Sequence, residues 1–160
     1  MIKIGSTSTL VSDYVVLFSK DPAIDQEAEG FGDIWEEYLK TGDHEKIPIK
    51  PGAAPTLFRL KHLRGYAKRQ LLQKVGSTAT ESGLPSGAGV FLAAQVCLLG
   101  IENLSDTEGK SFFVDTKYSK EYKTQIIADD TMDFLDDIED GELVNELGVR
   151  AILAVAPSPL

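Results

Sequence analysis

The segment 89–102 constrains the fold more than any other part of the chain, because it is almost entirely apolar. From Val90 to Ile101, only Gln95 and Gly100 interrupt the run of apolar residues. At about 12 residues this run is too short to cross a membrane, which takes about 20 residues. A helix that is apolar on every side belongs inside a core rather than on a surface. We therefore expect residues 89–102 to form one central helix on which the rest of the chain packs.

The rest of the chain predicts an α+β fold, and its 160 residues suit one domain. Short runs rich in β-forming residues predict strands at 14–18, 55–60, 111–114 and 122–127, the last two forming a hairpin. Apolar residues at helical spacing predict three amphipathic helices. The first starts at Asp21-Pro22 and ends at Gly42, the second is basic and spans 63–75, and the third starts at Asp129-Asp130. A short helix over 141–147 should stop at Gly148, and residues 149–156 fit a strand or a helix. The expected architecture is a small antiparallel sheet packed with a central apolar helix and outer amphipathic helices.

Two further segments are expected to be irregular. Residues 1–12 are polar and rich in Ser and Thr, so residues 1–20 are expected to form an extended N-terminal arm and the first strand. Residues 76–89 are rich in Gly, Ser and Thr and predict a mobile loop. The single α+β domain would then span residues 21–160. The N-terminal residues lack the apolar core of a secretory signal, which favours a cytoplasmic protein.

Charge is strongly segregated along the chain. Nine acidic residues and one Lys lie in Asp21–Glu45, eight basic residues and no acidic one in Lys46–Thr80, and nine acidic residues with no basic one in Asp129–Glu146. These blocks either pair within one molecule or contact oppositely charged faces of other molecules, for example in a head-to-tail assembly. The net charge of −9 argues against nucleic acid and anionic membranes as partners.

No residue pattern predicts catalysis, a metal site or a cofactor. Cys97 is the one cysteine and lies in the apolar segment, where a reactive thiolate is disfavoured. His44 and His62 lack the spacing of metal ligands. A calcium loop that starts at Asp136 would need an oxygen ligand at the position of Ile138. We therefore expect a protein without enzymatic activity.

Contacts with other proteins are the remaining class of site. Trp35 and Tyr38 lie at helical spacing and either pack in the core or anchor a partner, since aromatic residues are enriched at interfaces. The basic block would supply the charged part of such a contact. The candidate interaction residues are Trp35, Tyr38, Arg59, Lys61, Arg64, Lys68 and Arg69.

Three stretches together resemble a known class of proteins. They are Ile47-Pro48-Ile49-Lys50-Pro51-Gly52 with Pro55-Thr56-Leu57-Phe58-Arg59-Leu60 and Leu63, then Val96-Cys97-Leu98-Leu99-Gly100-Ile101-Glu102-Asn103-Leu104, and finally Leu143-Val144, Glu146-Leu147-Gly148 before an apolar end. Their order, over roughly residues 45–155, resembles small structural and assembly proteins of tailed bacteriophages. The layout is similar to that of tail assembly chaperones and of other small head or tail components.

The resemblance implies a role in building a virion, and it carries no catalytic residue. The expected function is that of a non-enzymatic bacteriophage virion structural or assembly protein that acts through protein–protein contacts. Its partners would be other virion proteins or copies of itself, in the host cytoplasm during assembly or in the virion. A capsid decoration or cement protein, an acidic host-directed regulator and a small enzyme with carboxylate chemistry remain alternatives.

Overall fold

A three-stranded antiparallel sheet forms the back of the molecule. The computed structural model describes residues 13–80, 86–105, 109 and 114–155. Within them, β1 (Asp13–Val16), β2 (Leu57–Lys61) and β3 (Leu98–Glu102) pair in the order β1-β2-β3, with β2 in the middle. Val16 lies opposite Phe58, and Phe58 lies opposite Ile101. The predicted strands at 14–18 and 55–60 are therefore confirmed to within two residues.

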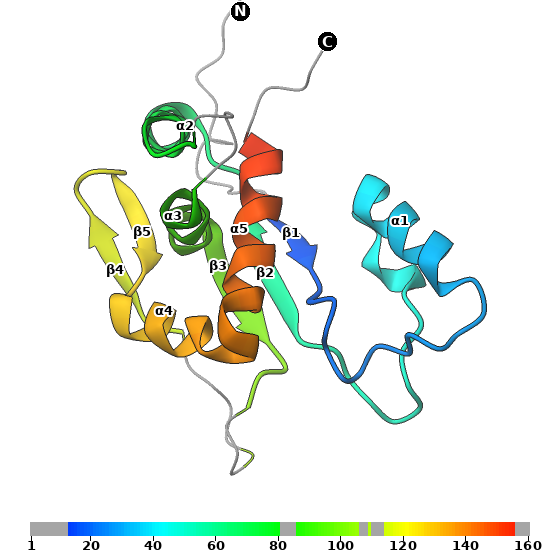
Figure 1. Cartoon of the computed structure of the whole chain (residues 1–160). Helices are drawn as coiled ribbons and strands as arrows, with labels where there is room; N and C mark the ends of the chain where they lie inside the picture. The colour runs from blue at the N-terminus through cyan, green and yellow to red at the C-terminus, as the bar shows by residue number, and fades with distance from the viewer. Residues whose placement is uncertain (1–12, 81–85, 106–108, 110–113, 156–160) are drawn as a thin grey trace, which may run out of the picture.

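Two helices pack side by side on this sheet and build the main core. α3 (Gly87–Cys97) is central, as predicted, and its residues Ala93, Val96 and Cys97 have no exposed surface. α5 (Glu142–Val155) lies along α3, while α2 (Gly65–Ser77) and α4 (Asp129–Asp136) flank the pair at opposite ends (Figure 1). The hairpin of β4 (Thr116–Ser119) and β5 (Thr124–Ile127) lies on the other side of α3. The chain is thus a single compact α+β domain, as expected from the sequence.

The apolar segment 89–102 does not form one helix throughout. α3 ends at Cys97, and Leu98 takes an extended conformation that starts β3 directly. β3 supplies the backbone partners that the second edge of β2 needs, because unpaired buried backbone groups are costly. Pairing with β2 therefore overrides the helical preference of the last five residues.

The expected helix end at Gly148 is also wrong. α5 runs from Glu142 to Val155 without a break, so it includes most of the ambiguous segment 149–156. A Cβ atom built on Gly148 would lie 2.1 Å from the carbonyl oxygen of Val90 in α3. The glycine lets the two helices approach each other closely rather than ending one of them.

The first amphipathic helix starts later than predicted. α1 spans Phe31–Thr41 and ends at Gly42 in a left-handed conformation (φ 74°), as expected, but residues 21–30 form turns. The Asp21 carboxylate accepts hydrogen bonds from the backbone N–H groups of Ala23 and Thr56. Asp21 therefore ties two loops together instead of capping a helix.

The remaining predictions differ in detail. The basic helix is confirmed as α2, and two 3₁₀ turns, η2 (His44–Lys46) and η3 (Ile138–Gly141), were not expected. The first strand of the hairpin is Thr116–Ser119 rather than 111–114, because it pairs with β5 in register, and Val114 lies in no strand. The arm 1–12, residues 81–85 of the expected loop and residues 111–113 lie outside the described residues. The described ends of that loop belong to helices, since α2 continues to Ser77 and α3 starts at Gly87.

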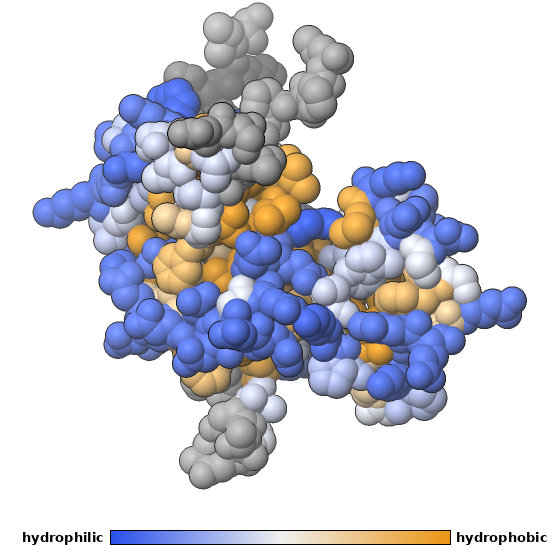
Figure 2. Space-filling model, viewed as in Figure 1, coloured by the Kyte–Doolittle hydropathy of each residue, from blue (hydrophilic) through white to orange (hydrophobic). Residues whose placement is uncertain are grey.

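A second, smaller core holds α1 beside the main body. It consists of Leu17, Ile24, Tyr38 and Ile47, and it is joined to the main core through β1. α1 stands apart from the other helices, and Figure 2 shows apolar surface on α5 and on α1 on the two sides of a hollow. None of the described helices has the length and apolar character needed to cross a membrane.

Candidate functional site

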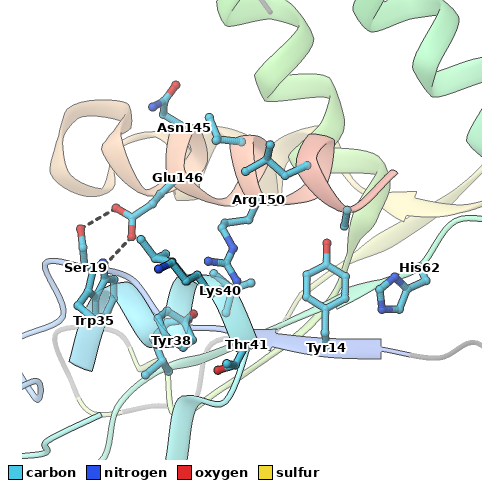
Figure 3. Close-up of a pocket in the computed structure, with 17 residues that line it drawn as sticks. Tyr14, Ser19, Trp35, Tyr38, Lys40, Thr41, His62, Asn145, Glu146 and Arg150 are labelled. Atoms are coloured by element: carbon cyan, nitrogen blue, oxygen red, sulfur yellow. Dashed lines mark hydrogen bonds between the residues drawn. The ribbon is translucent and has the colours of Figure 1, made fainter. Parts of the chain in front are cut away.

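The hollow is a cleft of about 650 Å³ between α1 and α5, with β1 as its floor (Figure 3). We call it the α1–α5 cleft. Its volume falls in the range of ordinary ligand-binding pockets. It arises because the small core sets α1 apart from the main body, so that neighbouring faces of α1 and α5 do not close on each other.

Exposed apolar side chains from both helices line the cleft. Leu39 of α1 is 48% exposed, and Val149 and Leu153 of α5 are 40% and 69% exposed. Single exposed apolar residues are normal on a protein surface, but a group of them around one concave site is typical of an interaction site. Val149 and Leu153 are one helical turn apart, so they form a continuous strip along α5.

Aromatic residues of α1 form one wall of the cleft. Trp35 lies between Phe31 and Tyr38, with ring centroids 5.9 Å and 4.9 Å away. The Tyr38 hydroxyl accepts a 2.8 Å hydrogen bond from the backbone N–H of Leu17, which fastens α1 to the end of β1. Burial raises the pKa of Tyr38, so its hydroxyl stays neutral. This wall is therefore aromatic and mostly apolar.

Arg150 places a positive charge in the cleft. Its guanidinium lies over the Tyr38 ring, 5.2 Å from the centroid, in a cation–π contact. The side chain is half-buried, and it forms no ion pair with any residue in the described part of the chain. Lys40 adds a second cation from the opposite wall. A partly desolvated cation without a carboxylate favours an anionic ligand.

Among the described residues, the one carboxylate that lines the cleft already accepts hydrogen bonds. Glu146 accepts a 2.7 Å hydrogen bond from the backbone N–H of Ser19 and another of 2.7 Å from the Ser19 hydroxyl. These bonds tie the loop after β1 to α5, as the dashed lines in Figure 3 show. These two hydrogen bonds stabilise the shape of the cleft. Glu146 forms no ion pair with Arg150.

Tyr14 lies at the far end of the cleft. Its ring is 4.6 Å from that of His62, and its hydroxyl is buried without a hydrogen-bond partner among the described residues. Burial raises the pKa of Tyr14, so the group is a neutral donor that faces the cleft beside α5. A ligand atom that accepts a hydrogen bond would satisfy it.

Cys97 and Asp129 do not line the α1–α5 cleft. The described residues contain no group of three or more His, Cys, Asp or Glu side chains that could hold a metal ion. Burial raises the pKa of the Cys97 thiol to about 12, so it stays protonated and is a poor nucleophile. Lys117 and Gln95 lower the pKa of Asp129, which is the opposite of what a general acid needs.

The structure separates the residues that the sequence singled out. Trp35 and Tyr38 both line the cleft, although Tyr38 is also part of the small core. Arg59 forms ion pairs with Asp13 and Glu102 across the sheet, at 3.5 Å and 2.9 Å.

Lys61 is buried, and this lowers its pKa. Its Nζ donates to the backbone oxygen of Gln125 at 2.6 Å. Of the five basic candidates, Lys68 and Arg69 lie in the first part of α2 and Arg64 is its N-cap residue, and we call these three residues the α2 face.

The charge blocks do not neutralise each other. The ion pairs of the described residues are Lys20–Glu142, Arg59–Asp13, Arg59–Glu102, Lys74–Glu121 and Lys117–Asp129. None of these pairs joins the basic block 46–80 to the acidic blocks 21–45 and 129–146. Pairing of the blocks within one molecule is therefore not seen in the described part of the chain.

Sequence reasoning missed the α5 side of the cleft and Tyr14. Glu146, Val149, Arg150 and Leu153 follow the i, i+3, i+4, i+7 spacing of one helix face. This signal was hidden by the expected helix end at Gly148, which divides the four residues between two segments.

Comparisons with known proteins found no relative of this chain. The chain matches no protein-family model, and searches of curated proteins and of solved structures found no match.

Proposed function

We propose that this chain is a non-enzymatic assembly protein that acts through contacts with copies of itself and with other proteins, in the building of a bacteriophage virion. The observation that carries the proposal is the separation of unpaired charge on the surface. The α2 face and the acidic helix α4 lie at opposite ends of the body, with α3 between them (Figure 1). Opposite charges at two ends favour contact between molecules, because each end attracts the other end of a neighbour.

The bacteriophage part of the proposal rests on the sequence resemblance. The three stretches that carry it belong to one packed unit, since β2 pairs with β3 and α5 packs on α3. The stretches that carry the resemblance therefore lie together in the framework of the fold. The protein would meet its partners in the host cytoplasm during assembly, or in the virion itself.

The mass of the protein in solution tests the proposal. Light scattering behind a sizing column should show species above the 17.4 kDa monomer at low salt and smaller species at high salt, because salt screens contacts between charged faces. A monomer under both conditions would argue against self-assembly and would favour a decoration protein or a regulator that binds only its target.

The double variant Arg64→Glu with Lys68→Glu tests the α2 face. We expect its mass at low salt to fall towards that of the monomer while its far-UV circular dichroism stays unchanged. Lys46→Glu with Lys50→Glu is the matched control, since both residues are exposed and the net charge changes equally. Equal behaviour of the two double variants would contradict a specific contact by α2.

A further inference from the structure

The α1–α5 cleft combines one half-buried cation with mostly apolar walls. The guanidinium of Arg150 forms no ion pair within the part of the chain that the structure describes. A guanidinium that is partly withdrawn from water interacts strongly with an anion, and its planar set of N–H donors matches the two oxygens of a carboxylate. The cleft therefore offers a specific place for a carboxylate.

The contact with Tyr38 fixes the position of this charge. The Tyr38 ring is buried, and its centroid lies 5.2 Å from the Arg150 guanidinium. The hydroxyl of the same ring accepts the 2.8 Å hydrogen bond from the backbone N–H of Leu17. The guanidinium therefore rests on a ring that is itself held in place. A ligand would meet an ordered cation, which reduces the entropy lost on binding.

Apolar side chains on both helices line the cleft around Arg150. Val149 and Leu153 are exposed on α5, and Leu39 is exposed on α1, next to the half-buried Trp35. Val149 and Leu153 are four residues apart, so the strip that they form on α5 is about 6 Å long at the usual helical rise. An alkyl chain that covers this strip would remove apolar surface from water on both the ligand and the protein.

We propose that the α1–α5 cleft binds a small amphipathic carboxylate, a molecule with one carboxylate and an unbranched alkyl chain. The carboxylate would accept hydrogen bonds from the Arg150 guanidinium, and the chain would lie between α5 and the aromatic wall of α1 (Figure 3). Lys40, on the opposite wall, would add a second and more exposed positive charge. This inference goes beyond the proposed function and does not depend on it, since one copy of the chain forms the whole site.

Two other classes of anionic ligand fit the cleft less well. A phosphate group carries up to two negative charges and three acceptor oxygens, whereas Arg150 is the one half-buried cation among the described residues that line the cleft. A peptide would find few backbone partners, because the two walls are helices whose interior backbone groups hydrogen-bond within the helix. An alkyl carboxylate needs neither several cations nor backbone partners.

Octanoate is the probe, and Trp35 reports its binding. Trp35 is the single tryptophan of the chain and lines the cleft. We expect its emission to shift to shorter wavelength as octanoate is added, because the alkyl chain displaces water from the indole ring. Isothermal titration calorimetry should give one site per chain. No response in either measurement up to about 5 mM octanoate would overturn the proposal, because burial of such a chain should give a lower dissociation constant.

The length of the alkyl chain tests the apolar part of the site. From butanoate to octanoate, the dissociation constant should fall about fourfold for each added CH₂ group that becomes buried. The affinity should stop rising once the chain is longer than the cleft. Equal affinities for butanoate and octanoate would contradict an alkyl chain bound against α5.

The head group of the ligand tests the charged part without any change to the protein. 1-Octanol has the same chain with a neutral head group and should bind about tenfold more weakly than octanoate, and octylammonium should bind more weakly still. Octylammonium that binds as tightly as octanoate would overturn the proposal. N-acetyl-leucine that binds more tightly than octanoate would overturn it as well, and would assign the cleft to the carboxyl end of a peptide.

Arg150→Gln removes the cation from the cleft. Octanoate should bind this variant about tenfold more weakly, whereas the affinity for 1-octanol should stay the same. Lys50→Gln is the matched control, since Lys50 is exposed, does not line the cleft and changes the net charge equally. Circular dichroism of both variants checks that the fold is intact. Equal affinities of the two variants for octanoate would overturn the role of Arg150.

Leu153→Gln removes an apolar contact from α5. Octanoate should bind this variant about fivefold more weakly, because part of its alkyl chain loses its apolar partner. Leu99→Gln is the matched control, since Leu99 is 43% exposed in β3 and does not line the cleft. A similar loss in both variants, or no loss in either, would place the alkyl chain outside the cleft and overturn the proposed site.

Discussion

Gly148 marks the closest approach between the two main helices. A Cβ atom there would lie 2.1 Å from the backbone oxygen of Val90 and 2.5 Å from its Cγ1 atom. Backbone atoms cannot move aside as a flexible side chain can. We expect Gly148→Ala to lower the free energy of unfolding by about 3 kcal/mol, at the upper end for overpacked sites. Urea denaturation of the variant measures this loss.

Gly76 provides the matched control for that prediction. It lies in α2 with ordinary helical geometry and has no atom within 4 Å of a built Cβ. Gly76→Ala should leave stability unchanged or raise it by up to about 1 kcal/mol, because alanine favours helix more than glycine does. Similar losses in both variants would show that close packing does not explain Gly148.

The same residue shows a limit of sequence reasoning. A glycine after an amphipathic run predicts a helix end, and Gly42 confirms this with its left-handed conformation. Gly148 follows a similar run but lies inside a helix. Both glycines follow an amphipathic run, and the local sequence does not show the close packing of Gly148 on α3.

At the scale of elements, local periodicity predicted amphipathic helices well and pairing partners poorly. α2, α4 and the end of α1 follow from apolar spacing alone. β3 does not, because Leu98–Glu102 is as apolar as the helix before it and becomes a strand only through β2. For the candidate site, Trp35 and Tyr38 could be chosen from sequence, whereas Arg150 required the unbroken α5.

The small core around α1 predicts uneven local stability. Four buried residues hold α1, whereas α3 lies in the centre of the main core. Elements with few buried contacts open more readily and exchange their amide protons faster. We expect α1 amides to exchange faster than those of α3 in native-state hydrogen exchange. Equal protection of the two helices would contradict an independently opening α1.

Tyr38→Phe sharpens this test. The variant leaves the buried N–H of Leu17 without its acceptor, which costs about 1–3 kcal/mol. Exchange in α1 should then become roughly 5- to 150-fold faster, since 1.4 kcal/mol corresponds to a factor of ten. Exchange in α3 should stay unchanged and serves as the internal control.

For the whole molecule, buried groups predict a loss of stability in alkaline solution. Burial raises the pKa of Cys97 from 9.0 to about 12, and that of Tyr122 from 10.0 to about 12. Both pKa values are higher in the folded chain than in the unfolded chain. The contribution of these two neutral groups to the free energy of unfolding is therefore complete below pH 9 and is lost as the pH rises towards 12. Each group contributes at most about 1.4 kcal/mol per pH unit. Lys61, whose pKa burial lowers, has the opposite effect as the pH approaches 10.5.

Cys97→Ala isolates one part of this behaviour. Between pH 9 and pH 10 the thiol ionises in the unfolded chain before the tyrosines do, so the variant should lose stability less steeply over this interval. Urea denaturation at closely spaced pH values measures the two slopes. The variant is expected to be less stable at every pH, because a buried atom is removed, and only the slope tests the prediction. Parallel curves would contradict it.

The joint between α4 and α5 sets the direction in which the acidic helix leaves the wall of the α1–α5 cleft. Glu139, Asp140 and Gly141 all have positive φ values, 49°, 54° and 88°, which is a rare run for two non-glycine residues. Because α5 also forms one wall of the α1–α5 cleft, this joint links the position of the acidic surface of α4 to that of the cleft. A substitution that changes the backbone of the joint would turn α4 relative to α5 without altering any residue that lines the cleft.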